Sequence, residues 1–97
     1  MENTQLNKTQ NIRVFHGTLP KLAGNTYEII LANINRHVIL DSFKTFNKML
    51  SPKGVLLISG ILTSDQKLVE QEAIQAGFKT VTTLEKNNWI CSWLTHQ

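Results

Sequence analysis

Polar residues and glycines follow three apolar stretches of the chain, at the points where strands would end. These segments are His16-Gly17-Thr18 after Ile12–Phe15, Asn33–Arg36 after Tyr27–Ala32, and Ser59-Gly60-Ile61 after Val55–Ile58. In open α/β sheets, ligands bind beyond the carboxyl ends of the strands. The sequence therefore predicts a ligand-binding edge built from these three segments.

Asn33 is the residue at this edge with the clearest chemical use. Its carboxamide oxygen can accept a hydrogen bond from a substrate amine without adding charge, which leaves the lone pair of the amine nitrogen free to attack. The plainer interpretation is that Asn33 turns the chain or caps the next helix, as asparagine often does. Spacing alone favours the plainer interpretation.

Gly60 and His16 each allow two interpretations. A glycine at position 60 lets either the backbone bend or a ligand approach closely, and the bend is favoured. A lone histidine at a strand end more often has a structural role than a catalytic or ligating one. No pair of His, Cys, Asp or Glu has metal-ligand spacing, so we predict no metal site. The sequence also contains no phosphate-binding glycine loop.

The elements that must position these residues follow from the apolar pattern. Tyr27–Ala32 and Val55–Gly60 are nearly continuous apolar runs, typical of strands with helices on both sides of a parallel sheet. Between them, Ser51–Gly54 is expected to end a helix and turn the chain. That helix is predicted from apolar residues at three- and four-residue spacing, namely Val38, Ile39, Phe43, Phe46, Met49 and Leu50.

The second half of the chain predicts another helix and a hairpin. Thr63 and Gln66 match a capping box, and Gly77 is well placed to end the helix that follows. Phe78–Leu84 and Trp89–Leu94 then read as antiparallel strands joined by a tight turn. We expect a single α/β domain over residues 1–97, with a mostly parallel sheet, a C-terminal antiparallel hairpin and helices on both faces.

Composition narrows the class of protein. With 97 residues and 41% hydrophobic residues, the chain can bury a core as one small domain. A net charge of +3, spread without a basic run, gives little support for nucleic-acid binding. No apolar run approaches the ~20 residues of a membrane span, so we expect a soluble, cytoplasmic protein. Cys91 lies in an apolar run and is expected to be a buried, inert thiol.

Several of these segments resemble one known family, the S-adenosylmethionine-dependent ribosomal protein L11 methyltransferases. Tyr27–Ile34 resembles their "YD-hydrophobic-ANI" segment, Leu50–Gly54 their "LKPGG" turn, and Leu57–Leu62 their "LSGIL" strand end. Ala76-Gly77-Phe78 is similar to "AGF", and Glu2–Asn7 to an "ENAxLN" helix. The resemblance covers essentially the whole chain and implies a partial Rossmann-like methyltransferase domain.

The resemblance also implies roles for individual residues. Asn33 would contact both the cofactor and the target amine, and Gly17 and Thr18 would lie near the cofactor where many related enzymes carry a Gly-Asp pair. Ser59 and Gly60, with Ile34, would contact the substrate, which in this family is a ribosomal protein methylated on amino groups.

The resemblance places the glycine-rich cofactor loop and two central strands before Met1 of this sequence. We therefore expect the strand at Ile12 to lack its usual sheet neighbour, and the 97 residues alone to be inactive. Two alternatives stay open. One is a non-catalytic interaction module that self-associates, or binds a complementing chain, through an exposed sheet edge. The other is a nucleic-acid methyltransferase, which the absence of an aromatic residue directly after Asn33 disfavours.

Overall fold

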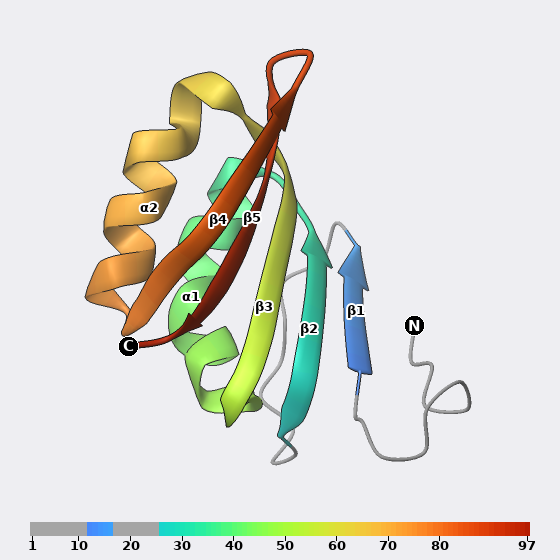
Figure 1. The fold of residues 1–97 in the computed structure, drawn as a ribbon, viewed down its shortest axis with the longest axis vertical. Coiled ribbons are helices and arrows are strands. Elements are labelled where there is room, and N and C mark those ends of the chain that lie inside the picture. The colour runs from blue at the N-terminus through green and yellow to red at the C-terminus, as the bar shows by residue number, and fades with distance from the viewer. Residues whose placement is uncertain (1–11, 17–25) are drawn as a thin grey trace.

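Five strands form one sheet in the order β1-β2-β3-β5-β4, and two helices pack against it (Figure 1). The computed structural model describes residues 12–16 and 26–97. The elements are β1 (Ile12–His16), β2 (Tyr27–Asn33), α1 (Arg36–Met49), β3 (Leu50–Leu62), a 3-10 turn (Thr63–Asp65), α2 (Gln66–Gln75), β4 (Phe78–Lys86) and β5 (Trp89–His96).

The strand directions confirm the predicted mixture of parallel and antiparallel pairing. β1, β2 and β3 run parallel, whereas β5 lies antiparallel to β3 and β4 antiparallel to β5. β1 pairs with β2 along its full length, from Ile12 opposite Ile29 to His16 opposite Asn33, so the strand at Ile12 has a neighbour within this chain. The expectation that its usual neighbour in the family is a different strand stays a prediction.

The prediction of helices on both faces was wrong for the residues that the structure describes. α1 and α2 lie on the same face of the sheet and contact each other (Figure 1). Their buried residues belong to one core, in which Phe43 of α1 packs near Phe78, with ring centroids 6.0 Å apart, and Val69 and Ala73 of α2 are buried. The core therefore lies between the helices and a single face of the sheet.

The opposite surface of the sheet, which we call the bare face, carries apolar side chains that no described helix covers. On β2 and β3 the helix-side residues are buried and the alternate residues are half-buried, as the two-residue period of a strand requires. Ile29, Leu31, Val55 and Leu57 are these half-buried residues, and Trp93 of β5 lies opposite Leu57 with 43% of its surface exposed.

Helix α1 confirms the apolar spacing and ends at Met49, just before the segment predicted to stop it, but that segment is not a turn. The helix starts after Asn35, whose side-chain oxygen accepts a hydrogen bond from the Val38 amide at 3.1 Å. Phe43, Phe46 and Met49 are buried as expected. Ser51–Gly54 was predicted to be a turn, yet β3 already begins at Leu50.

The reason is a bulge at the start of β3. Tyr27 of β2 pairs with Leu50, and Ile29 pairs with Val55, so the register shifts across residues 51–54. Proline has no amide hydrogen to give to a sheet, and a bulge is a position where none is needed.

The capping box predicted at Thr63 was also wrong. Thr63 starts a 3-10 turn, and its buried hydroxyl has no hydrogen-bond partner among the residues described. The Gln66 side chain donates instead to the Glu70 carboxylate at 3.1 Å. The other end of α2 agrees with the sequence, because Gly77 has a φ of +97° directly after the last turn, which glycine adopts without strain.

Candidate functional site

One lateral row of residues crosses all five strands near the carboxyl ends of β1, β2 and β3. His16 pairs with Asn33, Asn33 with Ser59, Ser59 with Cys91, and Cys91 with Leu84. Directly paired residues on neighbouring strands point to the same side of a sheet. The row therefore lies on the bare face. It brings the three predicted strand ends together, with Asn33 between His16 and Ser59.

Asn33 lies second in this row and is exposed. No other described residue forms a hydrogen bond with its carboxamide, so both its oxygen and its nitrogen are available to a ligand. Its backbone is fixed, because it is paired with His16 on one side and Ser59 on the other. A free polar side chain on a rigid strand suits a binding role.

Two hollows meet along the row, and Asn33, Ser59 and Cys91 line both of them. The first, of about 340 Å³, lies over the parallel strands and has mainly apolar walls. It is lined by Val14, Phe15, His16, Leu31, Ala32, Asn33, Leu57, Ser59 and Cys91. The second, of about 600 Å³, extends towards the β4–β5 hairpin and is lined by Asn33, Ser59, Gly60, Leu84, Glu85, Lys86, Trp89, Ile90 and Cys91.

The structure removes one of the plainer interpretations of Asn33. The cap of α1 is Asn35, and its backbone carbonyl also accepts the first helical hydrogen bond from Ile39 at 2.9 Å. Arg36, in the first turn, is paired with Asp65 at 3.1 Å. Asn35 and Arg36 thus each have a local structural partner, and the cap of α1 is Asn35 and not Asn33.

Gly60 confirms the predicted backbone bend. Its φ is +84°, and the pairing of β3 with β5 shifts register between Ser59 and Ile61. A β-bulge of this kind re-aims the residues beside it and is frequent next to functional sites. The Ser59 carbonyl accepts a hydrogen bond from the Ile34 amide at 3.3 Å, which ties the end of β2 to the bulge.

Three other residues, Ile34, Gly17 and Thr18, were predicted to belong to the site. Ile34 is only 2% exposed and its side chain belongs to the core, so any contact it makes with a substrate runs through its backbone. Gly17 and Thr18 lie outside the described residues, and their roles stay predictions.

Cys91, Leu84 and Trp89 line these hollows and were not predicted from the sequence as site residues. Cys91 was expected to be a buried, inert thiol, but it is half-buried and lines both hollows. Leu84 and Trp89 are 69% and 51% exposed at the mouth of the larger hollow. The strand pairing brings them to the site, and the sequence signals the hairpin without giving its register against β3.

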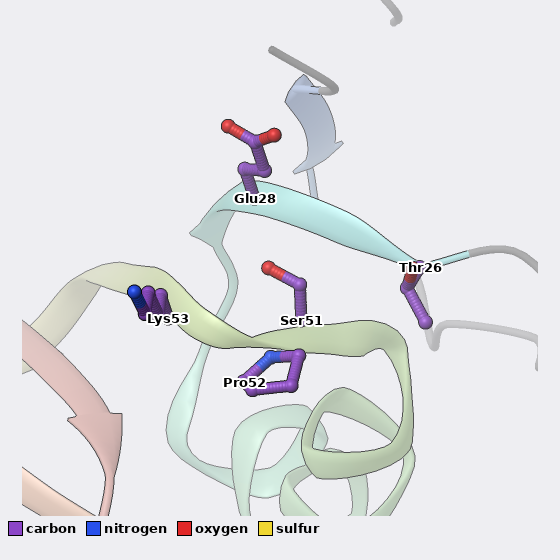
Figure 2. A pocket seen from close by; sticks show the side chains of 5 residues that line it. All are labelled: Thr26, Glu28, Ser51, Pro52 and Lys53. Atoms are coloured by element: carbon purple, nitrogen blue, oxygen red, sulfur yellow. The ribbon is translucent and has the colours of Figure 1, made fainter.

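A third hollow, of about 520 Å³, lies at the opposite end of β2 and β3 (Figure 2). It is lined by Thr26, Glu28, Ser51, Pro52 and Lys53, and the Glu28 carboxylate projects away from the other labelled side chains. These residues flank the bulge at the amino ends of the strands, whereas ligands of such sheets bind at the carboxyl ends. We therefore assign the site to the row.

The row can bind and orient a small polar group, and it contains no strong nucleophile with an adjacent base. Within residues 12–16 and 26–97 there is no cluster of three His, Cys, Asp or Glu side chains that could hold a metal ion. No helix in that part of the chain has the length and apolar character to cross a membrane. A carboxamide beside apolar walls suits a reaction that needs an amine held in a fixed orientation.

Comparison with known proteins identifies the family of this chain. The family profile described as "Ribosomal protein L11 methyltransferase (PrmA)" matches residues 1–97. Relatives called ribosomal protein L11 methyltransferase include one from Acetivibrio thermocellus, 34% identical over 92% of this chain, and one from Bacteroides thetaiotaomicron, 33% identical over 99% of it. The chain spans 28% and 35% of the length of these two relatives.

Solved structures share the fold at lower sequence identity. A ribosomal protein L11 methylase from Lactobacillus delbrueckii subsp. bulgaricus aligns with 77% of this chain and 39% of its own, with a TM-score of 0.75 and 21% identity. The complex of M1.HpyAVI with SAM aligns with 88% of this chain and 55% of its own, with a TM-score of 0.63 and 12% identity. The sheet is therefore of the Rossmann-like methyltransferase type. From the match over residues 1–97 and from relatives above 30% identity, the chain belongs to the ribosomal protein L11 methyltransferase family.

Proposed function

We propose that this chain forms part of an S-adenosylmethionine-dependent methyltransferase that methylates amino groups of a ribosomal protein. The observation that carries the proposal is the position of Asn33, whose exposed carboxamide forms no hydrogen bond with a described residue and lies in a row of paired strand ends. The family membership supports the same reaction class. A ribosomal-protein substrate would also place the protein in the cytoplasm.

The chemistry follows from what a carboxamide can do beside an amine. The Asn33 oxygen accepts a hydrogen bond from the amine that is to be methylated, and thereby fixes the direction of the nitrogen lone pair. When bound, S-adenosylmethionine supplies an electrophilic methyl group on a sulfonium. The walls of the smaller hollow beside Asn33 are mainly apolar, and Leu31 and Leu57 are among them.

The described residues fit only part of the cofactor. Apolar walls and one free carboxamide suit its reactive end, and the smaller hollow has no acidic side chain that could accept hydrogen bonds from sugar hydroxyls. We therefore propose that further polypeptide supplies the remaining contacts, and that the 97 residues alone bind the cofactor weakly and transfer no methyl group.

We also propose that the bare face packs against further polypeptide, either a complementing N-terminal chain or a second copy. Half-buried Leu31 and Leu57, with exposed Trp93, form an apolar surface of a kind that proteins usually cover. Parallel sheets, in particular, are covered on both faces. Sedimentation at several concentrations tests whether a second copy of the chain covers the bare face, because a monomer at all concentrations excludes self-association.

A chimera tests the proposed reaction. This chain would replace the matching segment of the Acetivibrio thermocellus relative, and transfer of a labelled methyl group from S-adenosylmethionine to purified ribosomal protein L11 would be measured. We expect methyl transfer that depends on Asn33. A folded chimera that binds the cofactor and methylates no amine would contradict the proposal.

Calorimetry on the chain alone tests the proposal that the 97 residues bind S-adenosylmethionine only weakly. We expect no heat of binding at micromolar concentrations of S-adenosylmethionine. Micromolar affinity would show that these residues suffice to hold the cofactor.

A further inference from the structure

Gly60 lies against the side chain of Asn33. A Cβ atom added to Gly60 would lie 2.6 Å from the Asn33 side-chain oxygen and 3.3 Å from the carbonyl oxygen of Ile34. The first distance is shorter than any relaxed contact between a carbon and an oxygen. A methyl group at position 60 and the Asn33 oxygen therefore compete for the same space.

Nothing polar among the described residues holds the Asn33 carboxamide in its orientation. Its backbone is fixed by pairing with His16 and Ser59, but its side chain is exposed and makes no hydrogen bond to a described residue. The neighbouring backbone of Gly60, kept in place by the bulge and a φ of +84°, is the rigid surface beside the oxygen. Because residue 60 has no Cβ atom, the Asn33 oxygen can lie beside this backbone.

We propose that Gly60 is a positioning residue for methyl transfer, whose missing side chain leaves open the space that the Asn33 oxygen occupies and keeps that oxygen uncovered for the acceptor amine. The catalytic part of this inference rests on the function proposed above. The geometric part, that residue 60 sets the position of the Asn33 carboxamide, stands on the contact alone.

The chain contains a matched control at Gly77. Its φ is +97°, and a Cβ atom there would lie 2.9 Å from the side-chain nitrogen of Asn47. Gly77→Ala therefore introduces comparable backbone strain and a comparable clash with an asparagine. It does so at the end of α2, outside the row and its hollows.

The geometric part is tested by NMR on the full chain, using the side-chain NH2 signals of Asn33, assigned by their loss in Asn33→Ala. We expect Gly60→Ala to shift these signals and to leave those of Asn47 unchanged. Gly77→Ala should do the reverse. A folded Gly60→Ala protein with unmoved Asn33 signals would overturn the inference.

A double-mutant cycle covers the case in which Gly60→Ala does not fold. Removing the Asn33 side chain removes the clash, so Asn33→Ala/Gly60→Ala should fold, and Gly60→Ala should destabilise the Asn33→Ala protein less than the parent. If the double variant also fails to fold, or if the two effects simply add, backbone strain alone explains Gly60 and the inference is wrong.

The catalytic part is tested in the chimera described above. We expect Gly60→Ala to lower kcat as far as Asn33→Ala does, and the double variant to be no slower than either. Gly77→Ala should keep the parent kcat. If the NMR shifts occur but kcat does not change in either Asn33→Ala or Gly60→Ala, the proposed role of Asn33 fails while the steric contact stands.

Discussion

The imidazole of His96 lies nearly parallel to the ring of Phe78, with centroids 5.6 Å apart and an interplanar angle of 14°. The same imidazole has its Nε2 atom 2.9 Å from the carbonyl oxygen of Leu50 and its Nδ1 atom 3.4 Å from the side-chain nitrogen of Asn47. An amide nitrogen can only donate, so Nδ1 accepts and Nε2 donates to Leu50. One ring therefore joins the end of β5 to β4, α1 and the start of β3.

His96→Phe should keep the stack and lose both polar contacts. The carbonyl of Leu50 would then lie against an apolar ring, and leaving such a group unsatisfied costs about 1–3 kcal/mol. We expect the free energy of unfolding in urea to fall by about this amount. His37→Phe is the control, because His37 is exposed at the start of α1 and should change stability by less than about 0.5 kcal/mol.

Asn33→Ala should lower activity, whereas Asn35→Ala should lower stability. In the chimera, Asn33→Ala should lower kcat by about 10²-fold, as the loss of one positioned polar group typically does. Asn35 caps α1, so Asn35→Ala should lower the free energy of unfolding by about 1 kcal/mol and leave kcat unchanged. Equal losses of kcat in both variants would show that Asn33 acts through the local fold.

The β4–β5 turn should tolerate glycine at its second position and reject a β-branched residue. Lys86 pairs with Trp89, and the two residues between them have φ values of 52° for Asn87 and 70° for Asn88. This is the two-residue turn in which Asn-Gly is preferred. Asn88→Gly should raise the melting temperature or leave it unchanged, whereas Asn88→Val should lower it. A higher melting temperature for the valine variant would contradict the turn geometry.

The core should be most sensitive where α1 meets the sheet. Phe46 is fully buried and lies 5.4 Å from Phe15, measured between ring centroids. Phe46→Ala should lower the free energy of unfolding by about 3–5 kcal/mol, which is a large part of the stability of a small domain. Ile74→Ala, at a position 54% exposed on α2, should have a much smaller effect in the same denaturation experiment.

The strands, the first helix and the hairpin could be predicted because each has a local signal. The apolar runs at Tyr27–Ala32 and Val55–Gly60, and the spacing of Phe43 and Phe46, depend on nearby residues alone. The position of the helices could not be predicted in this way. Apolar residues such as Leu31 and Leu57 show that both faces of a strand are apolar, and they do not show whether anything in the same chain covers the second face.

The candidate site was only partly predictable for a related reason. Asn33 and Gly60 were found because each directly follows or ends an apolar run. Their mutual contact and the approach of Cys91 depend on register between strands far apart in the sequence, which a bulge at Gly60 shifts by one residue. Thr63 was mispredicted for a different reason. The local sequence matches a capping box, but the chain forms a 3-10 turn there.

Both tryptophans of the chain, Trp89 and Trp93, lie four residues apart on β5, on the side of the sheet that the described helices leave uncovered. They are 51% and 43% exposed, so their indole rings should emit at the long wavelengths typical of a water-exposed fluorophore. Any polypeptide that docks there would move them into an apolar environment and shift the emission to shorter wavelengths. The protein thus carries its own optical reporter of assembly, readable without a label.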